Sequence, residues 1–258
     1  MRVHSRCREV VFSAGAGGRK GRTTIMAMTP LLTQTEVEEL RGYDTCMVAN
    51  AVEAFNVRLR NTGFTDASIR CMFEDAPPMV GYAVTARLRS GEPPMRGGVF
   101  RDRSEFWKSI LMAPAPRILV LQDMDEMPGR GAFIGDVHAS ILHALSCVGC
   151  VTNGAVRELP AVRALGLQLF AGNVAVSHAY AHIFDLGIEI TIGGMEVRTG
   201  DLLHGDRHGV LNVPLEIAAK IAATARVMKA EEQKVIEFCR SGSFSIPGLT
   251  DLMKKKSI

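Results

Sequence analysis

The sequence predicts a mixed α/β domain in which strands and helices are layered around one core. Two observations predict it. Strand-like apolar runs alternate with helix-like amphipathic segments through the middle of the 258-residue chain, and a series of short strand-like segments follows. Hydrophobic residues make up 47% of the chain, which is enough for a sizeable core, and no long linker divides the chain after residue 28.

Two helices are predicted at the start of this domain, within residues 32–55. Thr35 and Glu38 have the spacing of a capping box for the first helix. Either Asp44 or Thr45 has a side chain that can cap the second helix, whose apolar residues recur at helical spacing.

Alternating elements follow these helices. Strands are expected where apolar runs are bounded by Pro or Gly, and helices where apolar residues recur every three or four positions. In chain order they are a strand at 77–91, a helix at 102–114, a strand at 117–124, a turn-rich stretch at 125–136, a helix at 137–149, a strand at 150–154, a helix at 159–166 and a strand at 167–173. A β meander over 188–214 and a long amphipathic helix or pair of helices over 214–242 complete the expected domain.

The first 28 residues differ from the rest. Residues 1–25 carry a local net charge of +5 within a total of +3, which leaves −2 for the remainder. A mildly acidic body has no electrostatic footprint for nucleic acid, so no nucleic-acid partner is expected. Residues 1–28 are basic, Gly-rich and without periodicity, and they lack the apolar segment of a secretory signal. We interpret them as a disordered leader, either an extension from an upstream start or an organellar transit peptide, and place the domain at 29–258.

The cysteines and the hydropathy indicate a cytoplasmic protein. Without a secretory signal, its six cysteines are expected to be reduced. Cys147 and Cys150 have the spacing of half a zinc ribbon, but no second pair completes it, and both lie in an apolar run. They are therefore predicted to be small buried hydrophobes. No stretch of about 18 apolar residues occurs, so no transmembrane helix and no membrane partner are expected.

Two loops that follow strands and precede helices carry the candidate site residues. They are Gly135–His138 and Gly154–Glu158. Ligands of α/β sheets usually bind at such loops, and the free N–H groups of a helix N-terminus suit an anion. Arg157 adds a bidentate fork for a carboxylate, and Asp136 and Glu158 add oxygen ligands that suit Mg²⁺ or Mn²⁺. The structural alternative is that Asp136 is a helix N-cap and the other two are surface charges.

Two segments carry a family resemblance. They are GDVHASILHALSCVGCVTNGAVRELPAVRALGLQLFA at 135–171 and ITIGGMEVRTGDLLHGDRHGVLNVP at 190–214. Their most specific pieces are G-A-V-R followed by an acid, V-x-x-G-D, and G-D-x-x-G-V-x-x-V-P. Over roughly residues 30–245 the chain resembles the family of the regulator of ribonuclease activity A (RraA-like). That family includes the divalent-metal-dependent 4-hydroxy-4-methyl-2-oxoglutarate/4-carboxy-4-hydroxy-2-oxoadipate aldolases.

The resemblance implies a fold and an activity. The fold would be a single-domain αββα sandwich of the swivelling β/β/α type, assembled as a homotrimer or as a hexamer with active sites between subunits. The activity would be a Mg²⁺- or Mn²⁺-dependent C–C lyase that cleaves a 4-hydroxy-2-oxo diacid, a small anionic α-keto acid, to pyruvate. The same site would decarboxylate oxaloacetate, which also passes through pyruvate enolate. The rival implied role is a non-catalytic regulator that binds an RNA-processing enzyme.

The resemblance also implies residue roles. Arg157 would bind the substrate carboxylate, and Glu158 stands where the aldolases have a metal-binding aspartate. Asp136 matches an acid that helps to shuttle the proton through a metal-bound water. Glu232, or the adjacent Glu231, matches an acid that reaches the site of a neighbouring subunit. The loop and backbone amides that hold the pyruvyl carboxylate would come from Gly135, Val137, His138 and Ala139.

Two departures from the family pattern bear on activity. Glu158 is one methylene longer than the usual aspartate, and small displacements in a catalytic site are costly. Asn50 stands where the family usually has Asp or Glu. Asp136 favours a catalyst, because the regulator lacks an acid at that position.

The histidines and glycines add little further chemistry. His178 and His182 would face one way on a helix, and His204 and His208 lie in the meander. No acid completes a zinc-binding H-E-x-x-H motif, so packing or substrate-loop roles are expected. No glycine-rich strand–turn–helix fingerprint for a nucleotide cofactor occurs in the domain, which disfavours a methyltransferase and nucleotide hydrolysis.

Overall fold

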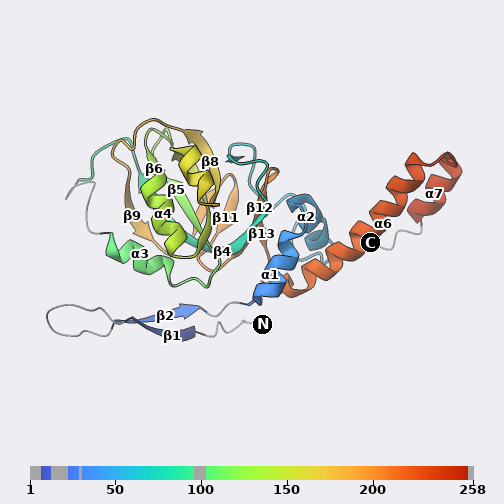
Figure 1. Cartoon of the computed structure of the whole chain (residues 1–258), viewed down its shortest axis with the longest axis horizontal. Helices are drawn as coiled ribbons and strands as arrows, with labels where there is room; N and C mark the ends of the chain where they lie inside the picture. The colour runs from blue at the N-terminus through green and yellow to red at the C-terminus, as the bar shows by residue number, and fades with distance from the viewer. Residues whose placement is uncertain (1–6, 13–22, 29–30, 96–102, 255–258) are drawn as a thin grey trace.

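The fold is described from a computed structural model, in which residues 7–12, 23–28, 31–95 and 103–254 are placed (Figure 1). Four parallel strands form the centre of its main sheet. They are β4 (Met79–Arg89), β5 (Arg117–Asp123), β7 (Cys147–Val156) and β8 (Gln168–Val174), hydrogen-bonded in that order. Most residues of β4, β5 and β7 are buried, as expected for parallel strands that are covered on both faces, whereas the last three residues of β8 are exposed.

In the part of the chain that the structure describes, five further strands extend this centre, all antiparallel to their neighbours except β6, which runs parallel to β7. Within the described residues the sheet has nine strands, in the order β13-β12-β4-β5-β7-β8-β3, with β6 paired to β7 and β9 paired to β4. The added strands are β3 (Arg70–Cys71), β6 (Ala132–Ile134), β9 (His182–Leu186), β12 (Leu202–Asp206) and β13 (Gly209–Val213). The segment before β3 bonds back to β13, with Thr65 N–H donating to Val210 O at 2.9 Å. The sheet is therefore nearly closed.

Alternate residues of each strand enter two separate apolar clusters. On β5, Leu119 and Leu121 belong to the larger cluster, whereas Ile118 and Val120 belong to the smaller one. Helices cover the larger cluster, and the hairpin of β10 (Ile190–Ile192) and β11 (Met195–Val197) covers the smaller one. The expected β/β/α layering of a single mixed α/β domain is thereby confirmed.

The short helices agree with the sequence in number but differ in their ends. They are α1 (Gln34–Arg41), α2 (Thr45–Glu53), α3 (Ser104–Ile110), α4 (Asp136–Ala144) and α5 (Leu159–Ala164). The capping box of α1 is made by Thr33 and Glu36, so the expected pair Thr35 and Glu38 was wrong by two residues. Asp44 caps α2 as one of the two expected candidates. Ser146, with φ 57°, ends the turn after α4, so β7 begins earlier than predicted.

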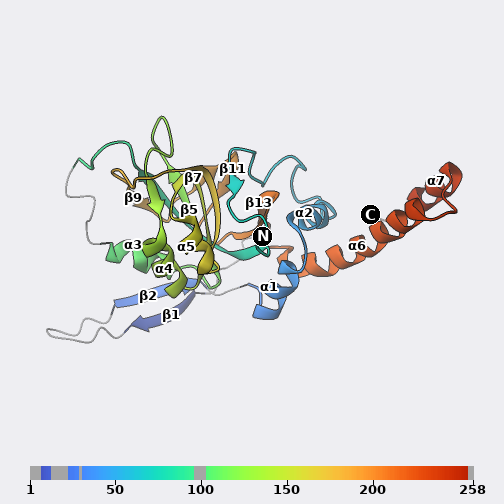
Figure 2. The same ribbon diagram turned by 45° about the horizontal axis from the view of Figure 1, so that its top comes forward.

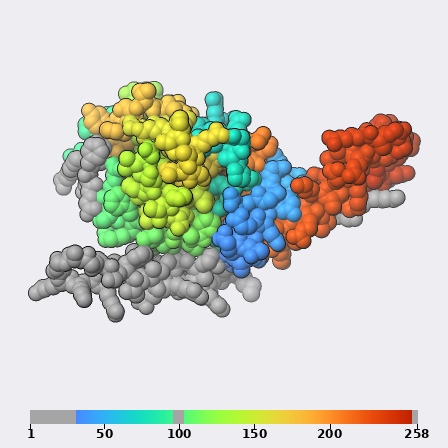
Figure 3. All heavy atoms as spheres, in the orientation of Figure 1, coloured from blue at the N-terminus to red at the C-terminus, as the bar shows by residue number. Residues whose placement is uncertain are grey.

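The C-terminal helices project from the body. α6 (Ala218–Arg240) is roughly 35 Å long, at 1.5 Å per residue, and its last buried residue is Met228. Beyond that point it extends away from the sheet, and α7 (Ile246–Lys254) lies beside its end (Figures 2 and 3). Among the described residues, no helix has both the length and the apolar character needed to cross a bilayer.

The N-terminal segment differs in part from the expected disordered leader. β1 (Cys7–Phe12) and β2 (Thr23–Met28) pair antiparallel, with Cys7 opposite Met28. Both strands contain β-branched or aromatic residues that favour extended backbone, a signal that the basic and Gly-rich surroundings obscured. The rest of residues 1–28 lies outside the described residues, and the division into leader and domain stays a prediction.

Candidate functional site

The two loops predicted to carry the site meet at one edge of the sheet. β6 runs parallel to the end of β7, with Ala132 opposite Ala155 and Ile134 opposite Val156. α4 starts directly after β6, and α5 starts directly after β7. The Arg157 N–H donates to Ile134 O at 2.9 Å and ties the two loops together. This pairing brings residues that are about twenty positions apart in the sequence to the same place.

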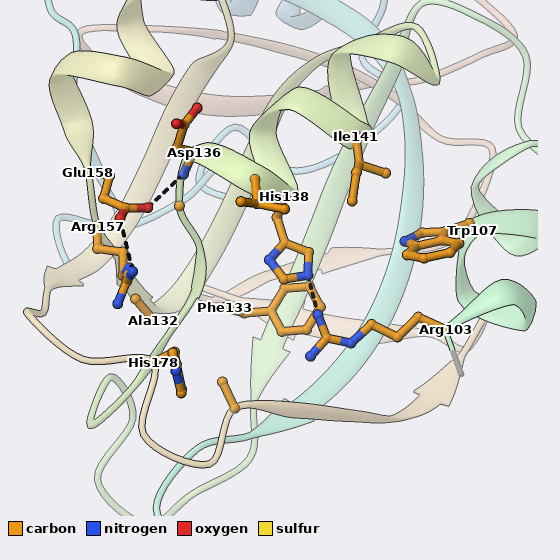
Figure 4. Close-up of a pocket in the computed structure, with 13 residues that line it drawn as sticks. Arg103, Trp107, Ala132, Phe133, Asp136, His138, Ile141, Arg157, Glu158 and His178 are labelled. Atoms are coloured by element: carbon orange, nitrogen blue, oxygen red, sulfur yellow. Dashed lines mark hydrogen bonds and ion pairs between the residues drawn. The ribbon is translucent and has the colours of Figure 1, made fainter. Parts of the chain in front are cut away.

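A pocket of about 620 Å³ lies at this edge (Figure 4). It includes most of the residues that the sequence singled out, together with an aromatic wall that the sequence did not predict. Its lining consists of Arg103, Trp107, Ala132, Phe133, Gly135, Asp136, Val137, His138, Ile141, Arg157, Glu158, His178 and Ala181.

Glu158 connects the two loops through its carboxylate. Its Oε2 accepts a hydrogen bond from the Asp136 backbone N–H at 2.8 Å, and its Oε1 accepts one from Arg157 Nη2 at 2.9 Å. Glu158 has φ 55° and ψ 38°, in the left-handed region that non-glycine residues rarely adopt. This backbone conformation turns the side chain back from the start of α5 toward the start of α4. It is the kind of local strain that concentrates at functional sites.

Gly135 leaves the room that this contact needs. A Cβ atom at position 135 would lie 2.4 Å from Glu158 Oε2, which is closer than real Cβ contacts allow. Any other residue at this position would therefore push the Glu158 carboxylate out of its place.

The electrostatics keep Glu158 ionised. The hydrogen bond from the Asp136 backbone lowers the pKa of Glu158, and the hydrogen bond from Arg157 lowers it further. Arg157 is itself anchored by a second bond, from Nη1 to Val176 O at 3.3 Å. The Arg157–Glu158 pair is thus an ion pair at the pocket rim, with side-chain exposures of 28% and 42%.

The start of α4 supplies backbone donors. Val137 and His138 belong to the first helical turn, in which no intrahelical carbonyl is available to the N–H groups. Ala139 differs from its expected role. Its N–H donates to Gly135 O at 2.9 Å, so this amide is already used within the helix. The Asp136 carboxylate is exposed and points away from His138 and Arg103 (Figure 4).

The other end of the pocket combines an arginine with aromatic rings. Arg103 Nη1 bonds to His138 Nε2, and the Arg103 guanidinium lies 5.1 Å from the centre of the Phe133 ring. Phe133 also packs against the His138 imidazole, with ring centres 4.5 Å apart. Burial, together with the nearby Arg103 charge, lowers the pKa of His138 to about 4, so this imidazole is neutral at pH 7.

Sequence reasoning named His138 but missed the other residues at this end of the pocket. Arg103 and Trp107 come from the start of α3, about 30 residues before the nearest predicted site residue. Phe133 lies in β6, a three-residue strand inside a stretch interpreted as turns. The only local signal was the run of three apolar residues, A-F-I, at 132–134. The indole N–H of Trp107 is buried and has no hydrogen-bond acceptor among the described residues.

The remaining histidines and the two cysteines of the C-x-x-C spacing lie in different parts of the fold. His178 lies in the loop before β9 and lines the pocket, whereas His182 begins β9, so the helix expected to carry both was wrong. His204 is fully buried, with Nδ1 2.9 Å from Thr45 Oγ1, which is a packing role. Cys147 and Cys150 are buried thiols, and burial raises the pKa of Cys147 to about 12, as expected of structural cysteines.

A divalent metal has suitable donors in this pocket. Mg²⁺ is usually bound through one or two carboxylates and completes its shell with water and substrate oxygens, which fits Asp136 and Glu158. A carboxylate offers about four lone pairs, so Glu158 can keep its two hydrogen bonds and still coordinate an ion. Within the described ranges, no three His, Cys, Asp or Glu side chains gather closely enough to hold an ion by themselves.

Two residues named from the sequence do not line this pocket. Glu232 lies in α6 beyond Met228, the last buried residue of that helix. Asn50 lies in α2, which packs against α6. The chain does not bring either residue to its own site.

Comparison with known proteins decides the family. The family model described as RraA-like, Aldolase/RraA, matches residues 45–212, well over half of the chain. The chain belongs to the RraA-like family. The resemblance inferred from the sequence is thereby confirmed.

Two relatives of this RraA-like protein share an aldolase name. A protein of Halalkalibacterium halodurans named "Putative 4-hydroxy-4-methyl-2-oxoglutarate aldolase" is 28% identical over 156 residues, which cover 60% of this chain and 69% of that protein. One of the same name from Alcanivorax borkumensis is 30% identical over 116 residues, covering 45% and 71%.

Solved structures show the same RraA-like fold. An uncharacterized protein from Pseudomonas syringae has a TM-score of 0.67 at 21% identity, covering 88% of this chain and 95% of that one. A Streptomyces coelicolor protein, described as an unusual member of the RNase ES inhibitor RraA protein family, has a TM-score of 0.60 at 19% identity, covering 81% and 99%.

Proposed function

We propose that this RraA-like protein is a divalent-metal-dependent C–C lyase that cleaves a 4-hydroxy-2-oxo diacid to pyruvate, with oxaloacetate decarboxylation as a second activity of the same site. The observation that carries the proposal is the single pocket in which Arg157, Glu158 and Asp136 meet the start of α4. Aldolase names among relatives at 28–30% identity support it.

Each residue has a role that its position allows. Arg157, anchored through Nη1 and through Glu158, presents its guanidinium to the substrate carboxylate. The backbone N–H groups of Val137 and His138 stabilise negative charge at the start of α4. Asp136 accepts the proton of the substrate hydroxyl, relayed by water, and returns it to the enolate carbon after the C–C bond breaks. The proton count of the cleavage therefore balances.

Mg²⁺ or Mn²⁺ would be held by Glu158, with Asp136 nearby. When bound, the ion supplies Lewis-acid stabilisation of the charge that develops on the keto oxygen. The hydrogen bond from Asp136 N–H and the ion pair with Arg157 keep the Glu158 carboxylate ionised and oriented for this task.

Oxaloacetate gives a simple test of this proposal. The protein is incubated with oxaloacetate and Mg²⁺, with and without a chelator, and pyruvate is followed in a coupled assay. Pyruvate formation above the metal-only background that chelator abolishes is the expected result. No such pyruvate, from oxaloacetate or from a branched hydroxy-oxo diacid, would reject the lyase and favour a non-catalytic regulator.

A further inference from the structure

We propose that the His138 side chain donates a hydrogen bond from Nδ1 to an oxygen of the bound substrate, and that Arg103 is the positioning residue that fixes the required tautomer. This inference rests on the proposed function for its substrate, but not for its geometry. It adds a side-chain role to a residue from which only a backbone amide was expected.

The tautomer follows from the contact with Arg103. An arginine guanidinium carries only donors, so His138 Nε2 must accept the hydrogen bond from Arg103 Nη1. A neutral imidazole with an unprotonated Nε2 carries its hydrogen on Nδ1. The Phe133 ring, 4.5 Å from the imidazole and 5.1 Å from the guanidinium, holds both groups in this arrangement.

The remaining ring nitrogen faces the polar half of the pocket. In Figure 4 the Nδ1 side of His138 is turned toward Arg157 and Asp136, whereas the Nε2 side is turned toward Arg103. No described residue accepts a hydrogen bond from Nδ1, and His138 lines the cavity. The Nδ1–H is therefore a donor that only a ligand or water can satisfy.

A second donor in the pocket has the same requirement. The Trp107 Nε1–H is buried without an acceptor among the described residues, and leaving such a donor unpaired is unfavourable. With Arg157, the pocket presents donors from three separate elements and calls for a ligand rich in oxygen acceptors. A carboxylate or an enolate oxygen beside the start of α4 meets this requirement at His138.

The donor acts without transferring a proton. A neutral donor positioned in advance stabilises charge that develops on an oxygen and needs no rearrangement at the moment of reaction. The contact would therefore be stronger for the enolate than for the starting ketone. Loss of the donor should lower kcat more than it raises KM.

The tautomer can be measured without substrate. In ¹⁵N-histidine-labelled full-length protein, long-range ¹H–¹⁵N correlations should show His138 protonated on Nδ1, with the signal assigned by its loss in His138→Asn. In Arg103→Met the population should move toward the Nε2-protonated form. An Nε2-protonated ring in the wild type, or no change in Arg103→Met, would overturn the proposal.

Oxalate, a planar dianion that resembles pyruvate enolate, tests the ligand contact. Its binding is measured by calorimetry with Mg²⁺ present. We expect His138→Leu to bind oxalate about tenfold more weakly, as for a lost hydrogen bond to a charged group. His138→Asn, whose amide nitrogen matches the Nδ1 position, should recover much of the affinity, and His138→Gln should not. His143→Asn, on the exposed side of the same helix, is the matched control and should bind like the wild type.

The outcomes separate this inference from the proposed function. Oxalate binding that depends on His138 without oxaloacetate turnover would reject the lyase and keep the donor. Turnover with equal oxalate affinity and equal kcat in His138→Leu, or no oxalate binding by an active wild type, would reject the donor and keep the lyase. Thermal melting of each variant checks that it is folded.

Discussion

At the residue scale, the site depends on how Glu158 reaches across to Asp136. The two loops were predicted from their place between strands and helices, and the structure brings them together. The sequence could not show that the extra methylene of Glu158 is used to reach the Asp136 N–H, because that contact depends on a left-handed backbone and on the space left by Gly135.

Shortening or neutralising Glu158 should have different effects. Glu158→Asp keeps the charge and suits a left-handed backbone better, so the fold should be as stable as in the wild type. Glu158→Gln keeps the length but loses the charge, and we expect at least a tenfold loss of Mg²⁺ affinity. Isothermal titration with Mg²⁺ measures this loss. Unchanged Mg²⁺ affinity in Glu158→Gln would remove Glu158 from the metal site.

Gly135→Ala tests the close approach directly. The new methyl group would displace the Glu158 carboxylate from the Asp136 N–H, so lyase activity should fall at least tenfold. Thermal melting should change far less than activity, because the clash is with the end of the exposed, flexible Glu158 side chain. Wild-type kcat/KM in this variant would show that the Glu158 contact is dispensable.

At the element scale, local patterns predicted the elements better than their ends. Apolar runs bounded by turn residues located β4, β5, β7 and β8, because strands in the middle of a covered parallel sheet are apolar on both faces. Long-range contacts decided the rest. Arg103, at the start of α3, meets His138 of α4 across 35 positions of sequence. The helix expected to carry His178 is instead a loop and a strand, because β9 pairs with β4.

The buried contact between α2 and β12 should make stability depend on pH. Burial lowers the pKa of His204, which is fully enclosed beside Thr45, below its value in the unfolded chain. The unfolded chain therefore binds more protons as pH falls below about 6.5, and stability decreases from there toward the folded-state pKa. Urea midpoints should be lower at pH 5.5 than at pH 7.5. A smaller difference in His204→Asn would assign the effect, and an equal difference would refute it.

At the scale of the whole molecule, the projecting C-terminal arm is the feature without an internal explanation. α7 buries no residue, and Ile246 and Met253 are 66% and 50% exposed. Apolar surface of this kind marks interaction sites. We expect the arm to contact neighbouring subunits of a homotrimer or hexamer and to carry Glu232 to a neighbour's pocket.

Native mass spectrometry and one variant test the assembly. The wild type should show the mass of three or six chains, and removal of residues 241–258 should weaken it. Glu232→Gln should keep the assembly but lower kcat at least tenfold, whereas Glu237→Gln, one turn further along α6, should do neither. A monomeric, fully active protein would contradict this account.

The central claim is that Arg157 and a divalent metal cleave a C–C bond in this pocket, and one measurement tests it most directly. 4-Hydroxy-4-methyl-2-oxoglutarate yields two pyruvates when its C–C bond breaks, so pyruvate per substrate consumed reports the reaction itself. The account predicts two pyruvates per substrate with Mg²⁺, none with chelator, and a loss of about 100-fold in kcat/KM for Arg157→Ala. Arg163→Ala, an exposed arginine on α5 outside the pocket, should keep the wild-type rate. Equal rates for Arg157→Ala and the wild type, or pyruvate that persists with chelator, would contradict it.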